Sequence, residues 1–162
     1  MTTSCRRLLR PVFLGPSAAL VLMAAAGCSS TDATASVTVP TPSSEAAAYC
    51  RALHKELPNA VAGQKRSDPG PGSDLTAGWG DGAIVLRCGV PRPAKMDDAQ
   101  SKAISASGVK WMLEQREGDG PRFTTTFRKA YVEVTFSAAY AHDVSPLAAF
   151  APAVRKSIPS SL

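Results

Sequence analysis

Apolar side chains recur along this chain with two different spacings, which divide much of it into predicted helices and strands. Between residues 45 and 57 they recur every three to four positions, as on the core-facing side of an amphipathic helix. The serines at 43–44 are suitable N-caps, and Pro58 ends the pattern. The same spacing over residues 147–158 predicts a final helix that Pro152 kinks or splits.

Between these helices, apolar and polar residues alternate with the period of two expected of strands buried on one side. The alternating stretches are residues 84–88, 109–115, 122–128 and 131–136. A Glu-Gly-Asp-Gly turn sequence separates the second stretch from the third, which predicts a hairpin. Residues 63–78 are rich in Gly, Pro, Ser and Asp and predict a mobile surface loop, whereas residues 97–102 predict a short helical turn.

This order of elements predicts a single α+β domain over residues 45–162. Its fold is an antiparallel sheet of about four strands, packed by an N-terminal and a C-terminal helix. The region is large enough for one core but small enough for that core to be only modestly stable. Ile84, Leu86 and Cys88 share one face of their strand, so Cys88 points toward the layer that contains Cys50 of the first helix.

The first 27 residues have the order of a secretory leader. Three arginines, at positions 6, 7 and 10, precede an apolar stretch that ends in small residues. Gly15, Pro16 and Ser17 interrupt this stretch and make it marginal as a permanent membrane-spanning helix. Ordinary cleavage near Ala26 and an uncleaved anchor remain alternatives, and the paired arginines leave the twin-arginine export route open.

The end of the leader, Ala25-Ala26-Gly27-Cys28, resembles the lipobox of bacterial lipoproteins. The resemblance implies that residues 1–27 are a lipoprotein signal peptide and that Cys28 becomes the lipid-modified first residue. The protein would then be held by lipid on the extracytoplasmic face of the cell membrane. Residues 28–44 are rich in Ser, Thr, Ala and Pro, and they predict a lipidated Cys followed by a flexible tether.

The charge of the chain speaks against nucleic-acid binding. The sequence has 18 Lys and Arg against 13 Asp and Glu, a formal charge of +5. Removing the three leader arginines leaves 15 against 13, or +2. A nucleic-acid groove needs a clustered excess of cations, so neither DNA nor RNA is a predicted partner.

The predicted export of the protein suggests different roles for its cysteines. Cys5 belongs to the leader and Cys28 to the lipid, which leaves Cys50 and Cys88 as one pair in an oxidising setting. We predict a disulfide between them, and two buried free thiols are the alternative. A redox-active pair is disfavoured because no C-x-x-C spacing is present.

Several segments of the chain resemble the DUF3515 family of uncharacterised actinobacterial lipoproteins. They are YCRALHKELPNAVAGQKR, AGWGDGAIVLRCGVPRP, GVKWM and GPRFTTTFRKAYVEVTFSAAY, which together span most of the folded region. The resemblance implies an exported, membrane-tethered protein with a paired Cys. It implies no activity.

Two groups of residues are candidates for a ligand site. Trp79 and Asp81 flank Gly80, and an aromatic face beside a carboxylate suits a sugar or a peptide. The simpler interpretation is a tight turn with Trp79 in the core. Arg87 and Arg92, with Arg122 and Arg128, have the planar guanidinium groups that grip phosphates and carboxylates, although scattered arginines also occur on any solvated sheet edge.

Catalytic patterns are scarce. His54 and His142 have no neighbouring residues at ligand spacing, so we predict no metal, no cofactor and no catalytic residue. The sequence therefore favours a non-enzymatic lipoprotein that binds a protein or cell-wall partner in the envelope. The alternative is a solute-binding or cell-wall-fragment-binding module that uses the segment from Trp79 to Asp81.

Overall fold

The structure is a computed structural model that describes residues 35–162. The predicted signal peptide, Cys28 and the first part of the predicted tether lie outside the described residues. Within them, no helix combines the length and hydropathy that crossing a bilayer requires.

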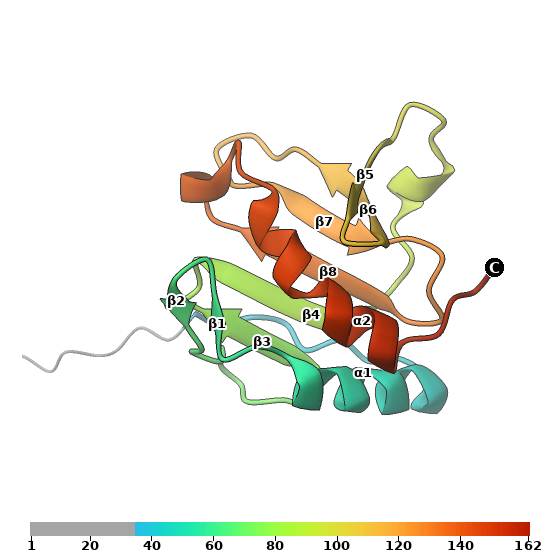
Figure 1. Cartoon of the computed structure of the whole chain (residues 1–162), viewed down its shortest axis with the longest axis horizontal. Coiled ribbons are helices and arrows are strands. Elements are labelled where there is room, and N and C mark those ends of the chain that lie inside the picture. The colour runs from blue at the N-terminus through green and yellow to red at the C-terminus, as the bar shows by residue number, and fades with distance from the viewer. Residues whose placement is uncertain (1–34) are drawn as a thin grey trace, which may run out of the picture. The chain divides into compact units, whose positions relative to one another are not determined.

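A six-stranded antiparallel sheet, with strand order β3-β4-β8-β7-β6-β5, forms the centre of the structure (Figure 1). The strands are β3 (Thr76–Trp79), β4 (Ile84–Val90), β5 (Lys102–Ala106), β6 (Val109–Glu114), β7 (Arg122–Thr125) and β8 (Tyr131–Phe136). A separate two-stranded hairpin consists of β1 (Ala60–Val61) and β2 (Gln64–Lys65). The α+β class and the hairpin of β6 and β7 are confirmed, but the prediction of about four strands is wrong.

The two strands missing from the prediction are the edges of the sheet. The β3 strand lies in the stretch predicted to be a mobile loop, yet it is fully buried and pairs with β4. The β5 strand begins where a helical turn was predicted, while the nearby 3₁₀ turn, η1, spans Ala94–Asp97. Both edges are joined to their neighbours by tight turns with positive φ, at Gly80-Asp81 and at Ser107-Gly108. Such turns hold short strands that have little β propensity of their own.

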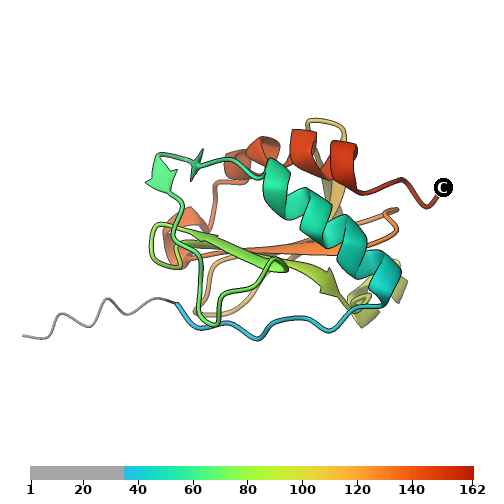
Figure 2. The same cartoon turned by 90° about the horizontal axis from the view of Figure 1, so that it is seen from below.

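The two helices cover one face of the sheet. Helix α1 (Ser44–Glu56) begins at Ser43, whose hydroxyl accepts a hydrogen bond from the backbone N–H of Ala46 at 3.3 Å. At the C-terminal end, a 3₁₀ turn η3 (Ser145–Ala149) leads into helix α2 (Ala151–Ser157), with Pro152 in its first turn. The predicted split at this proline is confirmed. Figure 2 shows both helices on the same side of the sheet.

The core lies between the helices and this face of the sheet. Alternate residues of each strand point into it, as the period of two predicts. Its largest fully buried side chains include Trp79, Trp111, Phe123, Phe136 and Phe150. The ring centroids of Trp79 and Phe150 lie 5.1 Å apart in an edge-to-face arrangement, which joins β3 to the C-terminal segment.

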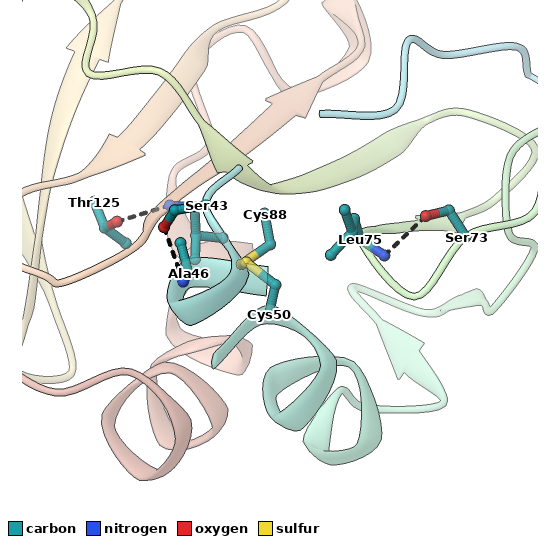
Figure 3. The surroundings of a disulfide bond; sticks show 8 residues. Ser43, Ala46, Cys50, Ser73, Leu75, Cys88 and Thr125 are labelled. Atoms are coloured by element: carbon teal, nitrogen blue, oxygen red, sulfur yellow. Dashed lines mark hydrogen bonds between the residues drawn. A yellow bond between two sulfur atoms is a disulfide. The ribbon is translucent and has the colours of Figure 1, made fainter. Parts of the chain in front are cut away.

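A disulfide between Cys50 and Cys88 joins α1 to β4 (Figure 3). Their Cα atoms are 5.5 Å apart, and each residue is only 1% exposed. The predicted pairing is confirmed. The crosslink closes a loop between positions 38 residues apart, so it restricts the unfolded chain considerably.

The opposite face of the sheet is crossed by residues 35–43, which we call the N-terminal strap (Figure 2). The N–H of Val37 donates to the carbonyl of Gly70 at 2.9 Å, and Arg87 donates to the carbonyl of Thr38 at 3.4 Å. Pro42 packs against Gly89, where β4 has a bulge. The strap was expected to be part of a flexible tether through residue 44. It packs instead, because its backbone finds hydrogen-bond partners that composition alone does not reveal.

We predict that removing the disulfide destabilises the domain strongly. The simple chain-entropy model gives about 4 kcal/mol for a loop of this size. The double variant Cys50→Ala/Cys88→Ala should show this loss in urea denaturation, and reductant should produce a similar loss in the wild type but none in the variant. An unchanged unfolding midpoint in both cases would contradict the prediction.

A glycine pair tests whether the strap contributes to stability. Gly89 has φ +86°, and a Cβ there would lie 2.6 Å from Pro42 Cγ. Gly118 has φ +73° but no neighbour within 4 Å. Gly118→Ala should cost about 1–2 kcal/mol from backbone strain alone. Gly89→Ala should cost clearly more in urea denaturation and make the strap more susceptible to proteolysis, whereas equal costs would show that the strap adds nothing.

Candidate functional site

The polar side chains of the alternating strands point to the face of the sheet opposite the helices, and we call this face the open face. One row across it follows the strand register through Arg87, Glu133, Thr124, Met112 and Ala103. The row is charged at the β4 end and apolar at the β5 end. These two halves have different chemistry.

The charged half is a self-neutralising network. Glu133 is only 6% exposed, and its carboxylate accepts hydrogen bonds from Arg87, with nitrogen–oxygen distances of 2.7 and 2.9 Å. Arg122 Nε lies 3.7 Å from the same carboxylate, and its Nη1 lies 4.0 Å from Glu114. Two arginines therefore face two glutamates. Such a network holds strands in register but leaves no net positive charge for an anionic ligand.

The other half of the open face contains a groove of about 390 Å³. Its floor is formed by side chains of the sheet, chiefly Met112, Lys110 and Tyr131. One wall comes from the segment that links β4 to β5, and the other from Phe127 and the C-terminal Ser161. A second hollow, of about 240 Å³, adjoins it at Tyr131 and is lined partly by the end of the strap.

Phe127 has an unusual conformation for an aromatic residue. Its φ is +55°, and 47% of its surface is exposed. Its carbonyl accepts hydrogen bonds from the backbone N–H of Ser161 at 3.1 Å and from the hydroxyl of Ser160 at 3.4 Å. The C-terminal segment thus holds a bulky residue in the left-handed region, which is strained for any residue with a β-carbon. Strained residues of this kind are concentrated at functional sites.

The groove has an excess of positive charge. Lys102 and Lys110 line it, and neither has a carboxylate within ion-pair distance among residues 35–162. Arg92 also lines it and pairs with the exposed Asp97 at 2.7 Å. The one carboxylate in the lining is Asp98.

Asp98 is already occupied by partners from its own loop. The ammonium of Lys95 and the backbone N–H of Gln100 each donate to it at 2.8 Å. These hydrogen bonds, with that of Lys95 the stronger influence, hold the pKa of Asp98 below its usual value. The same pairing raises the pKa of Lys95. Asp98 therefore fixes the loop and offsets little of the positive charge on Lys102 and Lys110.

Comparison with known protein families gives a match that covers most of the chain. The family described as "Protein of unknown function (DUF3515)" matches residues 13–162. The chain belongs to the DUF3515 family. Comparisons with curated proteins and with solved structures gave no match.

The predicted ligand-binding role of Trp79 needs correction. Trp79 is completely buried, and its indole N–H donates to the carbonyl of Pro58 at 3.0 Å. The guanidinium of Arg66 lies 5.2 Å from the ring centre. The parity of β3 places this side chain on the helix-covered face, so it belongs to the core of the DUF3515 domain. It presents no surface to a ligand.

The four predicted ligand-binding residues, Trp79, Asp81, Arg87 and Arg92, do not come together. Asp81 is exposed at the turn between β3 and β4, where its backbone N–H donates to Ser67 Oγ at 2.8 Å. Arg87 lies in the charged network, and only Arg92 lines the groove. The four arginines do not converge. Arg87 and Arg122 share the charged network, Arg92 lines the groove, and the guanidinium of Arg128 donates to the carbonyl of Ile158.

Sequence reasoning missed most of the groove. The alternation over residues 109–115 and 131–136 puts Met112 and Tyr131 on the polar side of their strands, and an apolar residue at such a position is a signal of a covered patch. The strand predicted over residues 122–128 puts Phe127 on its core-facing side. The strand ends at Thr125, and the positive φ of Phe127 turns its backbone out of the alternation.

The histidines take no part in the groove. His54 Nε2 contacts the guanidinium of Arg66 at 3.2 Å, and His142 is exposed. Within residues 35–162, no three His, Cys, Asp or Glu side chains form a group suited to a metal ion. That the protein uses no cofactor stays a prediction.

We predict a small, pH-dependent contribution from Asp98 to the stability of the DUF3515 domain. Because its folded pKa is depressed, this stabilisation is present above the unfolded pKa of about 3.9 and is lost as the pH falls through the folded pKa. Asp98→Asn should therefore lower Tm slightly at neutral pH, and the difference should vanish in acid. The exposed Asp74→Asn serves as the control. A Tm difference for Asp98→Asn that is independent of pH would contradict the role of this charge.

Proposed function

We propose that this protein is a non-enzymatic lipoprotein of the cell envelope, anchored through lipid at Cys28, that binds its partner in the groove on the open face. The observation that carries the proposal is the groove itself. It combines a concave surface, apolar groups such as the ring of Phe127, and a few charged groups, which is the usual composition of a binding site. The partner is an envelope protein or a cell-wall component.

Membrane anchoring is supported by the leader pattern and by the resemblance of residues 25–28 to a lipobox. With residues 35–43 packed on the domain, only residues 29–34 separate the strap from Cys28. Even a fully extended chain spans at most roughly 25 Å over this separation. The domain would therefore work close to the membrane surface and meet partners that are themselves near the membrane.

A binding role fits the chemistry of the lining better than catalysis does. General acid–base catalysis needs an acid and a base that converge on one point. The groove offers ammonium, guanidinium, thioether, aromatic and hydroxyl groups, and its one carboxylate is engaged by Lys95. The hydroxyls of Ser101 and Thr126 donate to backbone carbonyls. The groups of the groove attract and orient a ligand. They do not form a nucleophile with its base.

Fractionation of cells tests the anchor. Cys28→Ala should leave an unprocessed precursor or release the protein from membranes, because the lipid attachment is lost. Mass spectrometry of the mature wild-type protein should show acyl chains on Cys28. Unchanged membrane attachment with a normal mature mass would contradict the anchor.

Photo-crosslinking in cells tests the groove. We would replace Phe127, at the groove wall, with p-benzoylphenylalanine and compare it with the same replacement of Val144. Val144 is a matched control, because it is also an exposed apolar residue, 44% against 47%, but does not line the groove. Position 127 should give an adduct that position 144 does not. No adduct at 127, or the same adduct at both positions, would contradict the proposal.

A further inference from the structure

We propose that the groove selects an anion, a carboxylate or a phosphate, attached to an apolar ring or chain. This inference rests on the proposed binding function and specifies the chemical class of the ligand. Lys102, Lys110 and Arg92 would hold the anionic group. Phe127 and Tyr131 would contact the apolar body.

The charges of the groove set the preference for an anion. The lining contains three cations and one carboxylate, and that carboxylate already pairs with Lys95. Among residues 35–162, the only carboxylate that pairs with these three cations is Asp97, which pairs with Arg92. Their side chains are exposed by 72% and 45%, respectively. Exposed pairs of this kind are weak, so a bound anion can compete for Arg92. A cationic ligand would meet repulsion at every position except Asp98.

The apolar surface lies beside these cations. The Lys110 ammonium lies 5.6 Å from the ring centre of Phe127, so the ring and the charge face the same region. Tyr131 is half-buried and lines the same groove. Met112 lies below it, but at 2% exposure it offers a ligand almost no surface. A ligand whose charged group meets Lys110 therefore brings its adjoining atoms onto apolar surface.

The strain at Phe127 is explained by this arrangement. Asparagine or glycine adopts a positive φ at lower cost, and the half-exposed ring gains less from burial than a core aromatic does. Phe127 therefore lowers the stability of the fold, but it places an aromatic surface at the groove wall. A ligand that covers the ring would make use of that surface.

The experiment is an NMR titration of the folded protein with matched small probes. Phenylacetate and phenyl phosphate carry an anion on a ring, phenylacetamide is the neutral isostere of the first, and acetate has the anion without the ring. The two aromatic anions should shift the amides of Lys110, Thr126 and Tyr131 in a saturable way. Phenylacetamide should bind at least about tenfold more weakly, the effect expected from losing charge-assisted hydrogen bonds. The more tightly bound anion identifies the preferred head group.

Variants separate charge from aromatic contact. Lys102→Glu/Lys110→Glu should weaken phenylacetate binding at least about tenfold, whereas the exposed Lys65→Glu on β2 should leave it unchanged. Phe127→Asn should also abolish the binding of phenylacetate. Its Tm should be unchanged or higher, because asparagine relieves the backbone strain. Val144→Asn is its control. Unchanged probe binding in Phe127→Asn would overturn the role of the ring.

The outcomes distinguish this inference from the proposed function. Equal binding of phenylacetamide and phenylacetate would overturn the preference for an anion. A crosslink at position 127 in cells without binding of any probe would overturn the ligand class and leave the groove as the binding site. Probe binding without a crosslink would support the ligand chemistry and count against the proposed role in the envelope.

Discussion

The disulfide between Cys50 and Cys88 fixes the layer arrangement of this domain. It ties α1 to β4, next to the middle of the sheet, on the face that the apolar side chains of the strand turn toward the helices. Helix α2 packs beside α1 on that face, and the core fills the space between them and the strands. The other face is left to the strap, the charged network and the groove. A small domain has limited apolar area to bury, and a covalent bond at this position offsets part of the entropy lost on folding.

Much of this arrangement could be predicted from the sequence, because amphipathic periods report burial directly. The first helix, the split final helix and the strands around Leu86, Trp111, Phe123 and Val134 all show clear periods. The edge strands do not. The β3 strand reads Thr-Ala-Gly-Trp and β5 reads Lys-Ala-Ile-Ser-Ala, and such short sequences become strands only through pairing with their neighbours. The packed strap was missed for the same reason, since backbone hydrogen bonds leave little trace in composition.

The site was harder to predict than the fold. Trp79 is a conspicuous residue in the sequence, and an indole beside glycines and an aspartate suggests a ligand. In β3, however, its side chain lies on the core-facing side of the strand and is buried. The groove depends on residues from five separate segments of the chain, including Ser161 next to the C-terminus. No local pattern brings Phe127 and Lys102 together, because their proximity follows from sheet order and from the path of the link between β4 and β5.

The strap gives the domain a mechanical property. If the chain is held at its N-terminal side, any pull would first load the backbone hydrogen bonds of Ala35 and Val37 to Gly70. It would next load the contacts of Thr38 with Arg87 and of Pro42 with Gly89, and only then the start of α1. The strap can therefore detach from the domain in steps before the helix that carries Cys50 is disturbed. The core and the groove would stay intact under drag that displaces the strap.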